Sequence, residues 1–159
     1  MKRMVPLALV LAAAFLLTAG TQPGGGGQAV TYIESAKVAA AFAAGKPLLE
    51  VAAYKVHASR REKPGMAEVH VRDTDIIYVL DGAATMITGG TVVDGKTTAT
   101  DEIRGASIQG GESLQLVKGD VLVVPNGTPH WFKEISGPFL YYVVKVTSPE
   151  PAVTGEARR

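Results

Sequence analysis

The chain has 159 residues and no cysteine, and its 16 Lys and Arg residues nearly balance its 15 Asp and Glu residues. A disulfide framework and a lipid-anchored cysteine are therefore excluded. The balanced charge, with no long basic or acidic run, argues against nucleic-acid binding.

The first 20 residues, 1–20, have the pattern of a secretory signal peptide. A basic start at 1–4 precedes an apolar stretch at 5–17, which is too short to span a bilayer as a helix, and small residues follow at 18–20. Residues 21–30 have the Gly-rich composition of a flexible linker. We therefore expect an exported protein, periplasmic or extracellular, with no membrane span after cleavage; an anchoring helix is the alternative.

Residues 31–148 predict a single domain, followed by a tail at 149–159. Ser35–Ala44 contains strong helix formers and precedes Gly45, a common helix terminator, so we expect one short helix there. Its expected role is structural, as a brace or a dimer contact, with Phe42 among the apolar residues that would contact the rest of the domain.

Short apolar runs bounded by Gly, Pro, Asp and Asn follow the helix, and this pattern is typical of an all-β chain with tight turns. Eight or so strands would fit a double-sheet jelly roll. We expect them at residues 48–58, 68–72, 76–80, 84–88, 113–117, 121–124, 130–134 and 139–146.

Residues 89–111 form a longer connection than a hairpin needs, since most connections have about four to six residues. Residues 94–95, Asp-Gly, mark a tight turn within it. Glu102, Arg104 and Ser107 could fold over a pocket and contact a substrate, but we favour an ordinary surface excursion.

The segment before His130 carries the most specific spacing in the chain. The apolar strand Val121–Val124 ends at Pro125, which has no N–H to donate to a sheet. Gly127 then allows a sharp turn, because glycine adopts positive φ without steric cost. His130 opens the next strand, where alternation places it on the same face as Phe132, so the imidazole can point into a barrel.

A second histidine segment lies upstream. Glu68 and His70 are two residues apart and therefore face the same way on a strand. Asp75 follows after a short polar break and starts the next strand, which we expect to end at a turn at residues 81–82. Two strands thus present Glu68, His70 and Asp75, and a third presents His130.

These two segments resemble the motifs of the cupin superfamily. The second motif has a Gly, five residues, Pro, one residue, Gly, two residues and His, and it is matched at Gly119, Pro125, Gly127 and His130. The first motif has His-x-His, three or four residues, Glu, six residues and Gly. Counting back from Gly82 places Asp75 at the glutamate. His70 then stands at the second histidine and Glu68 at the first.

An alternative register places His70 first and Arg72 second, but it leaves only two residues before Asp75 and puts a guanidinium, which cannot ligate, in the site. We prefer the first register. The resemblance covers about residues 48–146 and implies an all-β fold, a double-stranded β-helix (cupin or jelly-roll barrel), with one short N-terminal helix. Because cupins commonly pair, it also implies a homodimer.

Glu68, His70 and His130 would supply two imidazoles and one carboxylate, the ligand set of non-haem Fe(II) oxygenases. Asp75 would be a fourth ligand, directly or through water, or would orient His70. Such ligands suit a divalent transition metal, namely Fe, Mn, Ni, Cu or Zn. The alternative is a pocket without metal, in which Glu68 pairs with Arg72 or a lysine and the histidines merely line the cavity.

Other candidates for a substrate pocket are carried by weaker signals. They are His57, Arg72, Phe132 and Tyr141. His57 either faces the cavity as an acid or base or lies on the surface. Tyr141 and Tyr142 point to opposite sides of one strand, so one of them must face inward.

Three functions fit these observations. The first is a metal-dependent enzyme acting on a small organic molecule, with oxygenase-type or isomerase-type chemistry. The second is a non-catalytic module that binds a small molecule, and the third is a structural dimer whose cavity is filled by its own side chains. The sequence assigns no residue a catalytic role, because one barrel architecture hosts many functions.

Overall fold

The computed structural model describes residues 29–149. The expected signal peptide, residues 1–20, and the linker up to residue 28 lie outside the described residues, as does the C-terminal tail from residue 150 onward. Export and cleavage therefore stay predictions. Within the described part of the chain, no helix is both long and apolar enough to cross a membrane.

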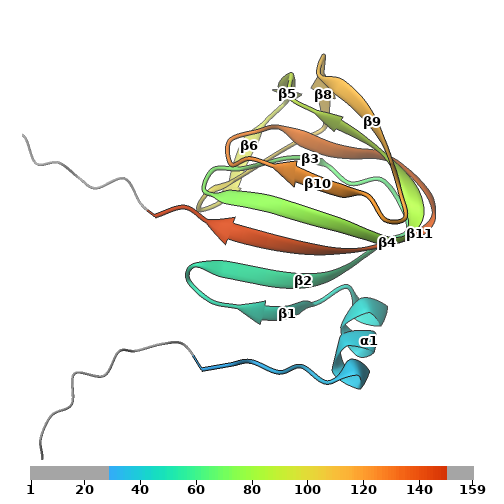
Figure 1. The fold of residues 1–159 in the computed structure, drawn as a ribbon. Helices are drawn as coiled ribbons and strands as arrows, with labels where there is room; N and C mark the ends of the chain where they lie inside the picture. The colour runs from blue at the N-terminus through green and yellow to red at the C-terminus, as the bar shows by residue number, and fades with distance from the viewer. Residues whose placement is uncertain (1–28, 150–159) are drawn as a thin grey trace, which may run out of the picture. The chain divides into compact units, whose positions relative to one another are not determined.

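The chain divides into a unit at Met1–Thr31 and a unit at Tyr32–Arg159, and the second unit carries the fold. Its described part is a double-stranded β-helix with one helix, which confirms the predicted all-β class (Figure 1). The elements are α1 (Ser35–Ala44), β1 (Pro47–Glu50), β2 (Tyr54–Arg61), β3 (Ala67–His70), β4 (Asp73–Thr88), β5 (Thr91–Val93), β6 (Lys96–Ala99), β7 (Glu102–Gly105), β8 (Ser107–Gln109), β9 (Glu112–Val117), β10 (Val121–Val124) and β11 (His130–Thr147).

The long antiparallel strands β4 and β11 connect the two halves of the fold. The first half of β4 pairs with β10 and its second half with β9. The second half of β11 pairs with β2, and its first residue, His130, pairs with Glu68 of β3. Figure 1 shows β2, β11, β4 and β10 side by side, in this order from the bottom upward. Register shifts in β11 mark the bend between the halves.

The prediction of a turn at residues 81–82 was wrong, because β4 runs without interruption through Asp81 and Gly82. Gly82 has φ 79°, and a Cβ there would lie 2.4 Å from the carbonyl oxygen of Pro138. The Asp-Gly pair therefore marks a bend of β4 against β11. Positive φ serves such a bulge as well as it serves a hairpin turn.

Three other expected strands also differ from the structure. The expected strands at 130–134 and 139–146 are joined in β11, while the expected strand at 48–58 is a hairpin of β1 and β2. The run at 48–58 contains no Gly or Pro, so nothing local signals its reversal.

The connection at 89–111 is largely strand rather than loop, since it contains β5 to β8. The expected turn at 94–95 is present, with Asp94 at φ 54°. The connection is more than the surface excursion that we favour from the sequence, because β7 pairs with β3 along its whole length. This pairing places Glu102 and Arg104 beside the segment that carries Glu68 and His70.

The predicted helix α1 is confirmed, and it ends at Gly45 with φ 60°. Phe42 contacts Tyr142 edge-to-face, with ring centroids 4.9 Å apart. The helix packs mainly against β2, as a brace would, and touches the outer face of β11 through this ring contact. The buried core lies on the inner face and consists of Ile77, Val79, Ala84, Met86, Leu116, Phe132, Phe139, Tyr141 and Val143.

Candidate metal centre

Strand pairing brings Glu68, His70 and His130 together. Glu68 and His70 share one face of β3, and His130 is the direct cross-strand partner of Glu68. One ligand atom from each residue lies within 4.8 Å of the others. These three residues are the candidate centre, and the sequence predicted all three as ligands.

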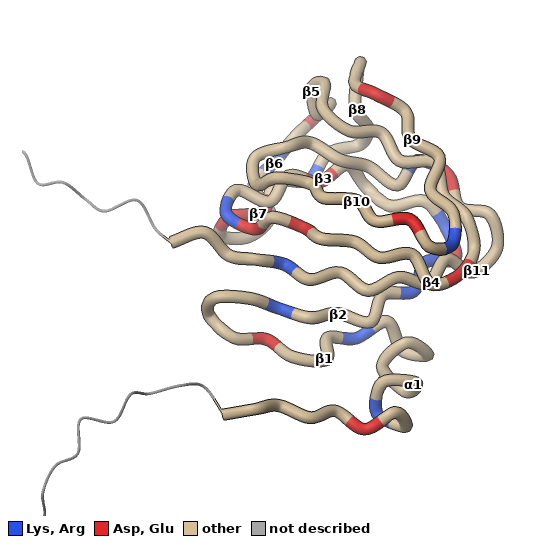
Figure 2. Tube along the Cα trace, viewed as in Figure 1, with Lys and Arg blue, Asp and Glu red and all other residues tan. Residues whose placement is uncertain are grey.

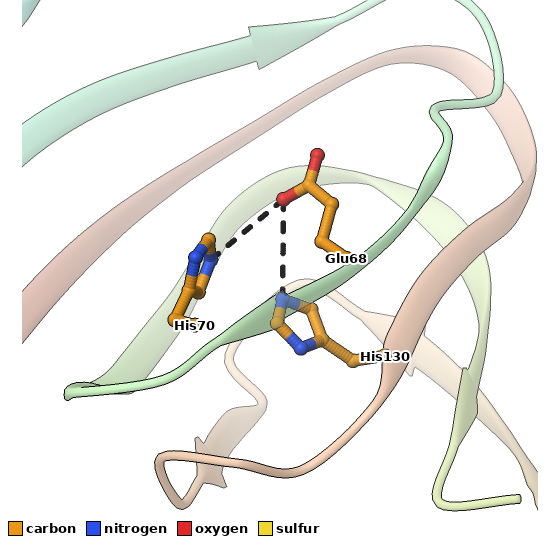
Figure 3. Close-up of side chains that lie close together, drawn as sticks. All are labelled: Glu68, His70 and His130. Atoms are coloured by element: carbon orange, nitrogen blue, oxygen red, sulfur yellow. Dashed lines mark ion pairs between the residues drawn. The ribbon is translucent and has the colours of Figure 1, made fainter. Parts of the chain in front are cut away.

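The geometry converges on one carboxylate oxygen. Oε2 of Glu68 lies 3.7 Å from Nε2 of His70 and 4.0 Å from Nε2 of His130. Figure 3 shows both imidazoles turned toward this oxygen. The residues are only 9%, 8% and 3% exposed, respectively. Because the separations exceed hydrogen-bond length, the three groups leave space for an ion among them.

Each imidazole is held by its other nitrogen. Nδ1 of His70 contacts Oε2 of Glu102 at 2.5 Å, and Nδ1 of His130 contacts the carbonyl oxygen of Thr128 at 3.1 Å. Metal-binding histidines usually donate their second N–H to a carboxylate or carbonyl in this way, which leaves Nε2 free to ligate. Nε2 of His70 is buried and makes no hydrogen bond to the described residues, since its neighbour Oδ2 of Asp75, at 3.4 Å, lies beyond ordinary hydrogen-bond length. A cation would satisfy this nitrogen, so the residues present fit a metal ion.

The two histidines have opposite pKa shifts. Burial is the largest influence on the pKa of His70 and lowers it, but contact with Asp75 and the charges of Asp75 and Glu102 outweigh burial, so the pKa is raised. The pKa of His130 is lowered, chiefly because burial disfavours the charged ring. His130 thus favours the neutral form that metal binding requires, while at His70 an ion competes with a proton.

Asp75 lies beside the centre but is held by another group. Nζ of Lys145, its cross-strand partner, contacts its two carboxylate oxygens at 2.8 and 2.7 Å. Oδ2 of Asp75 lies 3.4 Å from Nε2 of His70. Burial raises the pKa of Asp75, but contact with His70 and the charge of Lys145 outweigh it and lower the pKa. Asp75 is therefore placed to orient His70, and it is not one of the three converging residues.

Strand β7 supplies charged partners that lie outside the two histidine motifs. Across β3 and β7, His70 is opposite Glu102 and Glu68 is opposite Arg104. Nη1 of Arg104 lies 3.1 Å from Oε1 of Glu68, and Nη2 lies 2.8 Å from Oε1 of Glu102. Glu68 thus pairs with Arg104 rather than with Arg72. The signal that could have found this pairing is the Glu-x-Arg pattern of β7, which complements Glu-x-His in β3.

A family model described as cupin matches residues 37–158. The chain belongs to the cupin family. No curated protein sequence matches it. Among solved structures, this cupin resembles the protein BH2720 of Bacillus halodurans, with 12% identity, a TM-score of 0.52, and coverage of 84% of this chain and 87% of that chain.

Two further structures are similar at lower TM-scores. A Klebsiella pneumoniae protein with a double-stranded β-helix domain has 16% identity and a TM-score of 0.47, covering 67% of this chain and 78% of that chain. A hydroquinone 1,2-dioxygenase from Sphingomonas has 14% identity and a TM-score of 0.47, covering 63% of each chain. At 12% identity, the likeness to BH2720 shows the fold alone.

The candidate centre of this cupin opens into a cavity of about 510 Å³, a size within the range of small-molecule sites. His57, Phe132 and Tyr141, three of the expected pocket residues, line it. Nε2 of His57 lies 3.1 Å from Oε1 of Glu50 at the cavity wall. Arg72 does not belong to the lining, and its Nε and Nη2 donate to the carbonyl oxygen of Ser148 at 3.0 and 2.8 Å.

Tyr141 is the inward tyrosine, while Tyr142 contacts α1 on the opposite face. Burial raises the pKa of Tyr141, and Nε of Arg61 donates to its hydroxyl oxygen at 2.9 Å. The Cζ of Arg61 also lies 4.5 Å from the ring centroid of Phe132. These contacts hold one cationic side chain against the wall of the cavity.

Proposed function

We propose that this cupin binds a divalent transition metal through Glu68, His70 and His130 and acts on a small organic molecule in the adjoining cavity. The observation that best supports the proposal is the buried Nε2 of His70, which has no hydrogen-bond partner in the described part of the chain and faces the other two groups. An unpaired buried polar atom costs about 1–3 kcal/mol, so its presence calls for a ligand.

Two imidazoles and one carboxylate leave coordination positions open, as in non-haem Fe(II) oxygenases. A metal bound there would supply Lewis-acid or redox chemistry to a substrate oxygen. The donor set suits Fe, Mn, Ni, Cu or Zn. We therefore propose oxygenase-type or isomerase-type chemistry.

The chain's own residues would prepare this centre before substrate enters. Glu102 holds His70 by Nδ1, and the carbonyl oxygen of Thr128 holds His130 in the same way. Such outer partners fix the tautomer and the orientation of each ring. The Lys145–Asp75 pair flanks His70, and Lys145 neutralises the carboxylate of Asp75.

A non-catalytic binding module is the second candidate. It is favoured by the ionisable groups farther along the wall, since Lys55 pairs with Asp73 and Lys145 pairs with Asp75. Groups held in such pairs are poor proton carriers, whereas they can shape a binding site. Substrate turnover would separate the enzyme from the module.

The homodimer implied by the family stays a prediction. The outer faces of β4 and β10 carry exposed apolar residues in cross-strand pairs, Val121 with Tyr78 and Val123 with Ile76. This is where we expect the second copy to bind. A monomer in light scattering at all accessible concentrations would contradict it.

Metal analysis tests the proposed centre. Elemental analysis by plasma mass spectrometry would compare the tag-free protein, purified without chelator, with the double variant His70→Ala/His130→Ala. The matched control is His57→Ala, because His57 lines the same cavity but is not part of the candidate centre. We expect about one transition metal per chain in the protein and the control. Metal that is retained in the double variant, or never bound even after reconstitution, would overturn the proposal.

A further inference from the structure

Two guanidinium groups face the outer oxygen of the proposed carboxylate ligand. Nη1 of Arg104 lies 3.1 Å from Oε1 of Glu68, and Nη2 of Arg61 lies 3.8 Å from the same atom. They come from different strands, β7 and β2, and both line the cavity. The Arg61 side chain is 24% exposed and that of Arg104 is 39% exposed, so each retains open donor surface. Each guanidinium carries five N–H donors, more than these contacts use.

The charges of the lining change sign when an ion binds. Figure 2 shows acidic and basic residues mixed along the strands rather than separated into patches of one sign. Four cationic and five acidic residues line the cavity, namely Lys55, Arg61, Arg104 and Lys145 against Glu50, Glu68, Asp73, Asp75 and Glu102. With neutral histidines the net charge is minus one, and a divalent ion on the triad makes it plus one. A divalent ion thus makes the lining more favourable to an anion.

The positive charge that remains lies near the arginines. Lys55 is 2.6 Å from Asp73, and Lys145 is 2.7 Å from Asp75, so these lysines are already neutralised. An ion on Glu68 would share the carboxylate charge that Arg61 and Arg104 now face. Arginine is well suited to bind a carboxylate ligand in place of Glu68, because its planar guanidinium can form two parallel hydrogen bonds to a carboxylate.

An apolar wall stands beside this charged group. Ile77, Phe132 and Val143 line the cavity together with the buried ring of Tyr141. Phe132 and Tyr141 have ring centroids 5.3 Å apart and form a largely buried aromatic pair next to Arg61. A ligand with an anionic end and a small apolar body matches both parts of the lining.

We propose that the natural ligand is a small carboxylic acid, bound as its anion. Its carboxylate lies between Arg61 and Arg104 beside Glu68, and its apolar body contacts the wall at Phe132 and Tyr141. Metal and acid bind in order, because the ion on Glu68 frees Nη1 of Arg104 and Nη2 of Arg61 for the acid, while Nη2 of Arg104 stays paired with Glu102. This inference rests on the proposed metal function and specifies its substrate class.

Calorimetric titration tests the proposal with benzoate as the probe and benzamide, its uncharged isostere, as the comparison. The protein is titrated with and without bound Mn(II), and Arg61→Met and Arg104→Met are titrated with Mn(II). The matched control is Arg60→Met, since Arg60 neighbours Arg61 on β2, faces the other way and pairs with Glu62 at the surface. Thermal melts accompany every variant. Arg104 is the more exposed arginine, so Arg104→Met keeps the test valid if Arg61→Met is unstable.

We expect benzoate to bind the Mn(II) protein at least about tenfold more tightly than benzamide does, and at least about tenfold more tightly than it binds the metal-free protein. Each cavity arginine variant should lose about tenfold or more in benzoate affinity, while Arg60→Met stays unchanged. Equal affinity for the two probes, no benzoate binding to the Mn(II) protein, or an unchanged Arg104→Met would overturn the carboxylate site.

The same titrations separate the two proposals. Mn(II) stoichiometry is measured on each preparation before any probe is added. A chain that binds about one Mn(II) but shows no preference for benzoate keeps the metal centre and loses only the carboxylate site. A chain that takes up no metal overturns the proposed function, and the ordered binding of the acid with it.

Discussion

The two ends of the cavity handle buried charge in different ways. At the end formed by β4 and the last part of β11, Lys145 forms an ion pair with Asp75. Lys55 forms an ion pair with Asp73, which also accepts a hydrogen bond from Thr147. At the end formed by β3, β7 and His130, the outer atoms are partnered but Nε2 of His70 is not. Complete pairing is what a structural network needs, whereas an unpaired buried donor set marks a place for a ligand.

The largest expected effect is at the unpaired end. Glu68→Gln replaces a carboxylate ligand with a neutral amide, so we expect stoichiometric metal binding to be lost. Glu50→Gln is the matched control, because Glu50 is a carboxylate of the same cavity that contacts His57 instead. Mn(II) titration followed by electron paramagnetic resonance measures both. Equal metal binding by the two variants would contradict the role of Glu68 as a metal ligand.

The next effect concerns the paired end. Lys145→Met leaves the buried Asp75 carboxylate without its cation, which should lower the unfolding free energy of the metal-free protein by about 3 kcal/mol. The freed carboxylate can then turn toward the centre, so Mn(II) affinity should rise. Lys55→Met breaks a more exposed pair and should cost less than about 1 kcal/mol with no change in metal affinity. Denaturant melts with and without Mn(II) check this, and equal costs for the two lysines would contradict it.

A smaller effect is expected from the outer partner of His70. Glu102→Gln keeps the side chain's shape but removes the charge that orients the ring, and such partners contribute about 10–100-fold to metal affinity. Glu62→Gln, which changes a surface carboxylate paired with Arg60, should have no effect. Competition against a metal-sensitive dye gives the affinities. Unchanged affinity in Glu102→Gln would show that the short contact to His70 does not support the centre.

The smallest effect should appear as a pH dependence. Burial raises the pKa of Asp73, but Lys55 and Thr147 outweigh it, so the folded pKa lies below the unfolded one. The pair therefore stabilises the fold above the unfolded pKa of about 3.9, and this contribution is lost as the pH falls through the folded pKa. Asp73→Asn should be less stable by under about 1 kcal/mol near pH 7, and the difference should shrink in acid. A stability difference between Asp73→Asn and the unchanged protein that grows on acidification would contradict the lowered pKa of Asp73.

The sequence predicts the candidate centre better than its surroundings, because the centre depends on alternation along one strand and the surroundings depend on pairing between distant strands. Glu68 and His70 follow from alternation along one strand, and the turn at Gly127, with φ 76°, is confirmed. Lys145 could not be found, because its contact with Asp75 depends on the β4–β11 register, which joins residues 70 positions apart. Register of this kind is set by the whole sheet rather than by local pattern.

The strands show the same limit. Asp81 and Gly82 have the residue types of a hairpin turn, yet β4 continues through them because Gly82 lies against Pro138 of β11. Glu102 and Arg104 are recognisable in the sequence as polar residues of a long connection, but their partners depend on the pairing of β7 with β3. Local chemistry predicts the residue type needed at a position, whereas tertiary pairing decides what that residue does.

The most direct test is anomalous diffraction from crystals of the Mn(II)-loaded protein, with data collected on either side of the manganese absorption edge. The account predicts one peak among Oε2 of Glu68, Nε2 of His70 and Nε2 of His130, at about 2.0–2.3 Å from each atom. It also predicts that Lys145 keeps Asp75 outside this coordination sphere. No peak among the three atoms, or a peak at the Glu50–His57 contact instead, would contradict the proposed centre.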